Sequence, residues 1–334
     1  MEILVIDRPL VRRLLPMEEC VQAMREALAS LARGECVQPL RSIMWLPGKK
    51  GALGLMPGYT GRPSAAGVKV VTVFPGNHGT EYDSHQGAVL LFDSDHGHLL
   101  ALAEAGEITA IRTAAVSAVA TDLLAKEEAG DLALLGSGVQ ARQHLEAMSC
   151  VRSLRRVRVW SPTRDHCEEF ASRLSGRFGC RVETVTGPRE AVEGADLICT
   201  TTFASEPVLK GEWLVPGAHI NAVGSSLPTS RELDTLAVLR SRLFVDRLES
   251  TLNEAGDFLI PKKEGVIGDE HIQGEIGDIL EGKTGGRGED HEITLFKSLG
   301  LAVEDVQAIE WIYRKALEQG VGVKVPFGGS KDAS

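Results

Sequence analysis

The chain has 334 residues, of which 43% are hydrophobic and 25% are charged. This composition is typical of a globular protein, and the length exceeds what one hydrophobic core usually serves, so two domains are expected. The formal net charge of −10 argues against a nucleic-acid partner. No apolar run approaches the length of a membrane span, and the first residues lack the pattern of a signal peptide.

The cysteines and histidines predict neither disulfides nor a metal site. The six cysteines are scattered and form no CxxC pair, which favours a reduced protein of the cytoplasm. His96 and His98 lie in a turn without a third ligand nearby, so no metal is expected there. His219 lies in an apolar run and is expected in the core.

The first third of the chain has an α+β pattern. Apolar residues recur at helical spacing over residues 16–33, and after Val37 short apolar runs are separated by Gly and Pro. These runs predict a mostly antiparallel sheet with strands at 40–46, 52–59, 66–74, 86–92 and 99–104. Trp45, Met56 and Pro57 are expected in its core.

A helix is predicted over residues 107–125, and Arg112 is the only charged residue between Glu107 and Asp122. Two interpretations are open. The guanidinium reaches solvent along its aliphatic stem, or it is buried and faces an anionic ligand, because a buried arginine needs an anionic partner.

The stretch Leu132–His144 has the pattern of a dinucleotide-binding turn. An apolar strand, 132–135, runs into Gly136-Ser137-Gly138, and a helix follows. Gly136 permits the turn, Gly138 lets the backbone approach a pyrophosphate, and the N-terminus of the helix offers free N–H groups. The small residue at 141 lets the helix pack closely on the strand. Cofactor contacts are therefore expected at Gly136, Gly138, Val139, Gln140 and Ala141.

Strands and helices alternate after Gly130, as a Rossmann-type fold requires. Strands are predicted at 132–135, 157–160, 181–184, 197–201, 219–223 and 243–245, with helical stretches such as 164–175 and 189–193 between them. The pattern predicts a six-stranded, doubly wound α/β sheet, and the glycine turn follows its first strand.

The end of the second strand indicates the cofactor. In NAD enzymes, an Asp or Glu about 20 residues after the glycines binds the ribose hydroxyls. Here strand 157–160 is followed by Ser161, Thr163 and Arg164, with no carboxylate at its tip. These side chains suit a 2′-phosphate, so NADPH is expected, with NADH as the alternative. In that alternative, Arg164 is a solvated residue and Asp165 binds the ribose.

Several stretches resemble the ornithine cyclodeaminase/mu-crystallin family, in particular its ketimine reductase branch. The run Ile111–Ala118 is specific, and further matches lie at 53–59, 84–86, 206–213, 217–224 and 296–305. The resemblance implies a discontinuous α+β domain, residues 1–115 with 301–334, that binds substrate and forms a homodimer. Residues 116–300 would form the Rossmann NAD(P)-binding domain. A helix predicted over 303–319 would return to the first domain.

The resemblance implies that Arg41, Lys69 and Arg112 hold the carboxylate of an α-imino or α-amino acid. Arginine supplies a bidentate fork and lysine a point charge. Each residue alone would be interpreted as a surface salt bridge, whereas three cations at family positions favour a substrate site. Ser84 and His85 are implied near the nicotinamide, where His85 either donates a proton or contacts the cofactor. Further implied cofactor contacts are Thr113, Thr200, Thr201, Thr202, Val223, Gly224, Ser298, Leu299 and Gly300.

Position 226 distinguishes the branches of the family. The cyclodeaminases carry an aspartate there, which handles water and ammonia, whereas this chain has Ser226. A hydroxyl with an ordinary pKa is a poor general base near neutral pH. The resemblance therefore implies NAD(P)H-dependent reduction of Δ1-piperideine-2-carboxylate and Δ1-pyrroline-2-carboxylate to L-pipecolate and L-proline.

Three alternatives stay open. One is an ornithine or lysine cyclodeaminase, and a second is an open-chain imino-acid reductase or amino-acid dehydrogenase. The third is a non-catalytic protein that binds a small ligand of the iodothyronine type. The three retained cations argue against the third.

Overall fold

The computed structural model describes residues 1–77 and 79–328. The chain divides into two compact units, a first unit of residues 1–112 and 301–334 and a second unit of residues 113–300. The boundary after Arg112 falls inside helix α3 (Ala105–Leu124) and precedes the predicted boundary after residue 115. Residues 329–334, which the predicted first domain includes, lie outside the described residues.

The first unit is built on a seven-stranded sheet of order β15-β1-β6-β5-β4-β3-β2. All neighbours are antiparallel except β1 and β6, which are parallel. The short strands β1 and β15 were not predicted. Met56 is buried as expected, but the prediction of Trp45 and Pro57 in the core is wrong, because both are exposed. The strands are β1 (Glu2–Ile6), β2 (Ser42–Trp45), β3 (Ala52–Gly61), β4 (Ser64–Val73), β5 (His85–Phe92), β6 (Leu99–Glu104) and β15 (Val323–Pro326).

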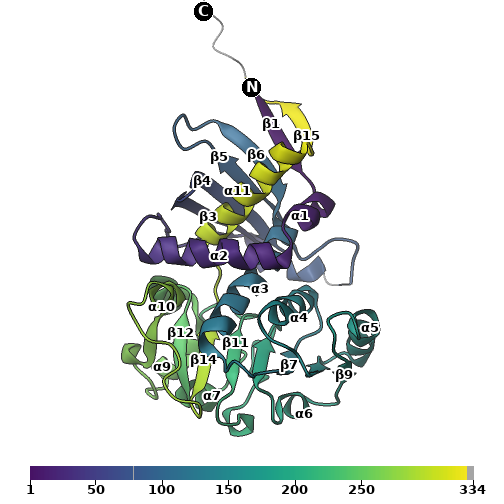
Figure 1. The fold of residues 1–334 in the computed structure, drawn as a ribbon, viewed down its shortest axis with the longest axis vertical. Helices are drawn as coiled ribbons and strands as arrows, with labels where there is room; N and C mark the ends of the chain where they lie inside the picture. Colours follow the sequence, from purple (N-terminus) through teal and green to yellow (C-terminus); the bar gives the residue numbers. More distant parts are fainter. Residues whose placement is uncertain (78, 329–334) are drawn as a thin grey trace, which may run out of the picture. The chain divides into compact units, whose positions relative to one another are not determined.

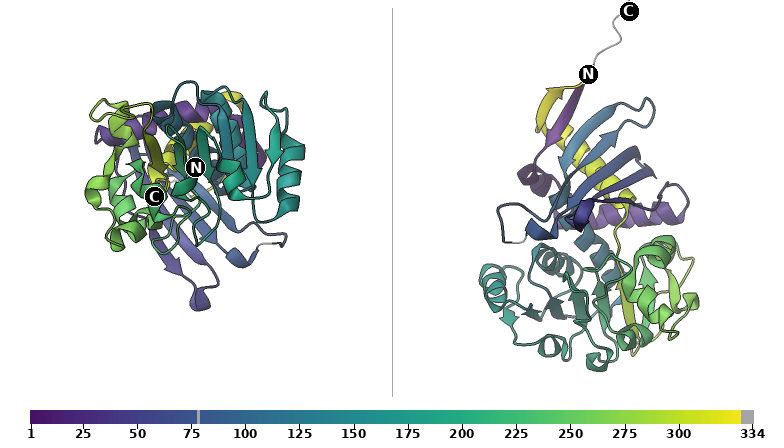
Figure 2. Two further views of the ribbon diagram at one scale, coloured as in Figure 1. Left: turned by 90° about the horizontal axis from the view of Figure 1, so that it is seen from below. Right: turned by 180° about the vertical axis from the view of Figure 1, so that it is seen from behind.

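Helix α11 (Ala302–Gln319) runs diagonally across one face of this sheet and packs on β3, β4, β5 and helix α2 (Met17–Ala32) (Figures 1 and 2). Glycines permit this close approach. A Cβ on Gly58 would lie 3.0 Å from the Cβ of Ala302, and one on Gly67 would lie 2.8 Å from Val306 Cγ2. The N-terminal turn of α11 is therefore held directly against β3 and β4. Helix α1 (Arg8–Leu14) and the 3-10 turns η1 (Pro47–Lys49) and η2 (Pro75–Asn77) complete the unit.

The second unit is a parallel, eight-stranded sheet of order β13-β12-β14-β11-β10-β7-β8-β9. The predicted α/β class with a Rossmann-type sheet is confirmed. The prediction of six strands is wrong, because β13 and β14 were missed. The strands are β7 (Asp131–Leu135), β8 (Arg156–Trp160), β9 (Val182–Thr184), β10 (Leu197–Thr200), β11 (His219–Ala222), β12 (Ser241–Val245), β13 (Ile272–Glu275) and β14 (Ile293–Lys297).

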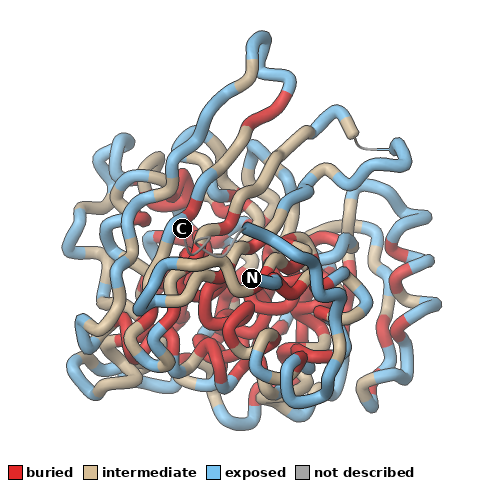
Figure 3. The backbone as a smooth tube through the Cα atoms, turned by 90° about the horizontal axis from the view of Figure 1, so that it is seen from above, coloured by how far each residue is buried: buried red, intermediate tan, exposed pale blue. Residues whose placement is uncertain are grey.

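Strand β14 escaped prediction although all five of its residues are buried; buried segments are red in Figure 3. Thr294 and Lys297 interrupt the apolar run by which a buried parallel strand is usually identified. Both polar side chains are satisfied inside the protein, Thr294 by His219 and the carbonyl of Leu124, and Lys297 by Asp257. Only the folded environment therefore makes this sequence a core strand.

The helices of the second unit flank its sheet together with the C-terminal part of α3. They are α4 (Val139–Val151), α5 (Arg164–Leu174), α6 (Pro188–Val192), α7 (Thr235–Leu239), α8 (Leu248–Glu254), α9 (Gly256–Lys263) and α10 (Ile276–Leu280), with the 3-10 turns η3 (Gly211–Trp213) and η4 (Asp269–His271). Among the described residues, no helix is long and apolar enough to cross a membrane.

Candidate active site

The glycine turn lies where the strand order of the second unit reverses. From β7 the chain builds β8 and β9 on one side and then crosses to β10 on the other. Such a switch point forms a ligand crevice at the carboxyl ends of the strands. Gly136, with a φ of 118°, follows β7, and a Cβ there would come within 2.7 Å of Thr201 Oγ1. The turn thus requires glycine and lies directly beside the end of β10.

The N-terminus of helix α4 fits the phosphates of a dinucleotide. Its N-cap is Gly138, no side chain caps it, and its first turn contains no acidic residue. No atom lies within 4 Å of where a Cβ of Gly138 would be. Gly138 and Val139 are exposed, whereas Ala141 is fully buried. Uncapped N–H groups at an open helix N-terminus favour an anionic ligand.

The residues after β8 form a polar end to the same crevice. Ser137 Oγ in the glycine turn donates to Ser161 Oγ at 3.0 Å, and Ser161 Oγ donates to the carbonyl of Thr163. Arg164 begins α5, is exposed and donates from Nε to Glu168 at 2.8 Å. Asp165 is also exposed in this first turn. Ser137, which was not among the predicted contacts, joins the turn to the second strand.

The remaining predicted cofactor residues of the second unit lie at the ends of three neighbouring strands. Thr200, Thr201 and Thr202 end or follow β10, Val223 and Gly224 follow β11, and Ser298, Leu299 and Gly300 follow β14. Strand β11 pairs with both β10 and β14. Ser226 lies in the exposed segment after β11, and Thr113 is buried in α3. The topology therefore gathers these residues at one edge of the sheet.

Two predicted substrate residues of the first unit, Lys69 and Arg112, converge on helix α11. Lys69 Nζ on β4 lies 2.7 Å from Asp305 Oδ2, and Arg112 Nε on α3 lies 2.9 Å from Asp305 Oδ1. Arg112 Nη1 also lies 2.7 Å from Glu304 Oε2. Both cations are 3% exposed and both carboxylates are fully buried. Arg112 is therefore not a solvated residue, and its anionic partners come from the protein itself.

Burial and neighbouring charges tune this cluster. Burial lowers the pKa of Lys69 to about 8; Asp305 opposes this shift, whereas Arg112 and Arg41 add to it. Burial raises the pKa of Asp305, but Arg112 and Lys69 outweigh it and hold that pKa below its ordinary value. Arg41 is half-buried and directly precedes β2. All three predicted cations thus act on one electrostatic site.

The donors of the site suit a carboxylate ligand. The buried cations Lys69 and Arg112 are paired with the buried carboxylates of Asp305 and Glu304, and the charge of Arg41 acts on Lys69. An ammonium has three N–H donors, and among the described residues Asp305 and Thr109 Oγ1, at 3.4 Å, accept from Lys69. A third N–H of Lys69 is thus available to a ligand.

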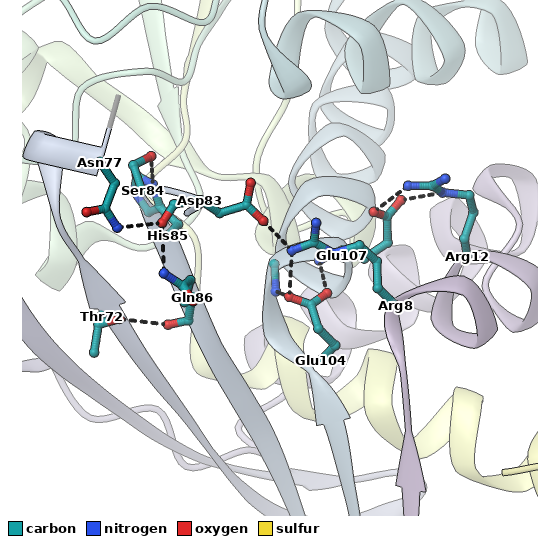
Figure 4. Close-up of polar contacts among 11 residues, drawn as sticks. Arg8, Arg12, Thr72, Asn77, Asp83, Ser84, His85, Gln86, Glu104 and Glu107 are labelled. Atoms are coloured by element: carbon teal, nitrogen blue, oxygen red, sulfur yellow. Dashed lines mark hydrogen bonds and ion pairs between the residues drawn. The ribbon is translucent and has the colours of Figure 1, made fainter. Parts of the chain in front are cut away.

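Ser84 and His85 stand at the start of β5 in a polar network of the first unit (Figure 4). Ser84 Oγ lies 3.1 Å from His85 Nδ1. The carbonyl of Asp83 accepts from Asn77 and Gln86, and its carboxylate pairs with Arg8 at 2.5 Å. Loss of water around the ring, and then the charge of Lys69, lower the pKa of His85. The imidazole is therefore neutral near pH 7.

The sequence analysis missed four buried carboxylates, two in each unit, that hold neighbouring segments in place. Glu304 and Asp305 stand in the first turn of a helix, where acidic residues are ordinary because they favour the helix dipole. In the second unit, buried Glu232 and Asp246 accept hydrogen bonds from backbone N–H groups beside predicted cofactor residues. No local pattern marks these four positions, because their partners are distant in sequence.

Comparison with known proteins identifies the family. The model of the ornithine cyclodeaminase/mu-crystallin family matches residues 2–320. The chain belongs to this family. The predicted resemblance is confirmed, and with it the expected kinship to the mu-crystallin branch. The mouse protein named ketimine reductase mu-crystallin is 42% identical over 296 residues, which cover 88% of this chain and 90% of that protein.

Two solved structures of the family share the fold closely. The Δ1-pyrroline-2-carboxylate reductase of Thermococcus litoralis, in complex with NADH and L-proline, has a TM-score of 0.95 and 40% identity, and covers 97% of this chain and 100% of its own. An archaeal alanine dehydrogenase dimer with bound NAD has a TM-score of 0.93 and 31% identity, and covers 98% of this chain and 100% of its own. A nicotinamide cofactor is therefore a shared property of these neighbours and fits the glycine turn of this chain.

Proposed function

We propose that this protein reduces cyclic ketimine carboxylates, Δ1-piperideine-2-carboxylate and Δ1-pyrroline-2-carboxylate, to L-pipecolate and L-proline. The observation that carries the proposal is the pair of buried cations Lys69 and Arg112, which Asp305 and Glu304 hold together, in a chain that also has a dinucleotide turn. The names of the mouse and Thermococcus litoralis relatives support the same substrate class.

The residues of the first unit would bind and orient the substrate. Lys69, Arg112 and Arg41 would hold its carboxylate, and the rigid pairing of Lys69 and Arg112 with Asp305 fixes where that carboxylate lies. A nicotinamide cofactor, when bound, would supply the hydride that reduces the protonated C=N bond to a CH–NH group. A protonated imine is already electrophilic, so positioning and electrostatics suffice for much of the catalysis.

Ser226 limits the reaction to reduction. Release of ammonia from a diamino acid requires a general base that activates a nucleophile. Ser226 lies in the exposed segment after β11, and its hydroxyl supplies no such base. The imidazole of His85, whose pKa is lowered by burial and by Lys69, would contact the substrate nitrogen within the first unit.

A spectrophotometric assay tests this function. Oxidation of NADPH and of NADH is followed with Δ1-piperideine-2-carboxylate, with Δ1-pyrroline-2-carboxylate and with pyruvate plus methylamine. Turnover of the cyclic imines at the highest kcat/KM is expected. No turnover with any of these compounds contradicts the proposal. Reductive amination of pyruvate without cyclic-imine turnover would instead favour an amino-acid dehydrogenase, as the archaeal structural neighbour suggests. Ammonia release from L-ornithine without added cofactor would indicate a cyclodeaminase.

The pKa of Lys69 predicts a pH limit on substrate binding. Lys69 is charged below about pH 8 and neutral above it, so the KM for the imino acid should rise above about pH 8. Lys69→Arg should remove this rise, because arginine stays protonated throughout the range. Initial rates between pH 6 and 10 give both profiles, and the KM for the cofactor serves as the control. If the KM for the imino acid rises in the same way in Lys69→Arg, another titrating group, such as the imine itself, causes the rise.

NADPH is the proposed cofactor, because Ser161, Thr163 and Arg164 surround the end of β8 without a carboxylate at the strand tip. Arg164→Ala should raise the KM for NADPH about 10-fold and leave that for NADH nearly unchanged, since one charge-assisted hydrogen bond to a phosphate is lost. Arg173→Ala is the matched control, because Arg173 is also exposed on α5 and pairs with an acidic residue one turn away. Equal effects of Arg164→Ala on both cofactors would contradict a 2′-phosphate contact.

The protein is proposed to form a homodimer through strand β2, an edge of the first unit's sheet. All four residues of β2 are exposed, and Ile43, Met44 and Trp45 offer 41%, 54% and 54% of their surface to solvent. Exposed apolar edge strands favour association. Trp45→Glu should give a monomer in analytical ultracentrifugation, whereas Val323→Glu on the opposite edge strand should not. A wild-type monomer at micromolar concentration would contradict the proposal.

A further inference from the structure

Two buried carboxylates hold segments of the second unit that carry predicted cofactor contacts. Glu232 is fully buried and Asp246 is 1% exposed. Glu232 accepts the backbone N–H groups of Thr202 and Gly224, and Asp246 accepts those of Leu299, Gly300 and its neighbour Arg247. A carboxylate that accepts several backbone N–H groups is held firmly, because such charge-assisted hydrogen bonds are short and strong.

Glu232 joins the ends of β10 and β11. Its Oε1 accepts from the N–H and the hydroxyl of Thr202, at 2.6 and 2.7 Å. Its Oε2 accepts from the hydroxyl of Thr200 at 2.8 Å and from the N–H of Gly224 at 2.7 Å. Both oxygens are thus used by groups at the carboxyl edge of the sheet.

The two segments that Glu232 joins touch each other directly. A Cβ on Gly224 would lie 2.0 Å from the carbonyl oxygen of Thr202 and 2.5 Å from Glu232 Oε1. Only glycine at 224 permits this contact. The path of the backbone over β10 and β11 therefore depends on Gly224 and on the carboxylate that bridges it to Thr202.

Buried Lys297 and the carboxylate of Asp257 hold Glu232 in place. Asp257 Oδ1 accepts from the N–H of Glu232 at 2.8 Å, and Asp257 Oδ2 lies 2.9 Å from Lys297 Nζ. Lys297 also donates to the carbonyl of Ser225 at 2.5 Å. Burial and then Asp257 raise the pKa of Glu232, and Lys297 opposes that shift. The same network therefore holds the segment that leads to Ser226.

Asp246 holds the segment after β14 in the same way that Glu232 holds the segments after β10 and β11. Its Oδ2 accepts from the N–H groups of Leu299 and Gly300, at 2.5 and 2.8 Å. Asp246 follows β12, the neighbour of β14. The two carboxylates thus hold the three segments after β10, β11 and β14, which carry predicted cofactor contacts.

We propose that Glu232 is a positioning residue for the nicotinamide half of the cofactor, and that Asp246 has the same role for Leu299 and Gly300. The two halves of a dinucleotide lie on opposite sides of the switch point. The adenosine half belongs to β7 and β8, with Gly136 and Arg164, and the carboxylates act on the other half. The inference rests on the proposed cofactor site and names the residues that shape it.

The proposal predicts a selective loss of affinity in Glu232→Gln. A glutamine has one acceptor oxygen and an NH2 donor, so either Thr202 or Gly224 loses its acceptor. The Kd for NADPH and NADH, measured by quenching of tryptophan fluorescence, should rise about 10-fold. The Kd for adenosine 2′,5′-bisphosphate, which carries only the adenosine half, should stay within about twofold of wild type. Asp246→Asn should give the same pattern of Kd values. This second variant tests the proposal if Glu232→Gln does not fold.

Asp196→Asn is the matched control. Asp196 also accepts two backbone N–H groups, from Gly130 and Asp131 at 3.0 and 3.1 Å, but at the amino end of β7. This variant should melt at a lower temperature with unchanged Kd values.

The outcomes distinguish the positioning role of Glu232 from the proposed cofactor site itself. Equal weakening of NADPH and of adenosine 2′,5′-bisphosphate by Glu232→Gln, or no weakening of either, overturns the positioning role while the wild-type cofactor affinity stands. Failure of the wild type to bind any dinucleotide overturns the proposed cofactor site and the inference with it.

Discussion

The pairing of Asp305 with Lys69 and Arg112 is the interaction on which the first unit depends. It joins strand β4, helix α3, which continues into the second unit, and helix α11, the last helix of the first unit. Removing one partner of a buried ion pair leaves an uncompensated charge and typically costs about 3–5 kcal/mol. Lys69 and Arg112, which are proposed to bind substrate, are therefore also structural, and in that proposal helix α11 would set the position of the substrate carboxylate.

Buried carboxylates are stabilised in two different ways in this protein. In the first unit, Glu304 and Asp305 face cations. In the second unit, Glu232 and Asp246 face backbone N–H groups. The first arrangement holds two buried cations together, which suits the proposed anionic substrate. The second fixes the path of the backbone, which suits a site where a large cofactor must lie in one orientation. The carboxylates of the first unit therefore position cations, whereas those of the second unit position the backbone.

The difference between reduction and deamination depends on few atoms. A shared fold with closely related relatives of several named activities, among them a pyrroline-carboxylate reductase and an alanine dehydrogenase, shows that the scaffold alone does not select the reaction. In this chain the selection is proposed to rest on Ser226, which offers no general base, and on Lys69 and Arg112, which would hold one carboxylate. The scaffold supplies the common part, which is a crevice for the dinucleotide at the switch point of the sheet.

The sequence by itself determined the features that depend on local spacing. The glycine turn, the doubly wound pattern after Gly130 and the helix around Arg112 are encoded by neighbouring residues, because periodicity and turn chemistry act over a few positions. The family resemblance added Arg41, Lys69 and Ser226 as proposed site residues, because short motifs can be recognised in the sequence.

Only the tertiary structure decided which groups meet. Arg112 and Glu304 are 192 residues apart, and no spacing rule relates them. Strand β14 has a polar residue at two of its positions and becomes a core strand only because His219 and Asp257 satisfy them. Trp45 is apolar yet exposed, because β2 is an edge strand. Burial, pairing and pKa are properties of the surroundings of a side chain, and folding alone supplies those surroundings.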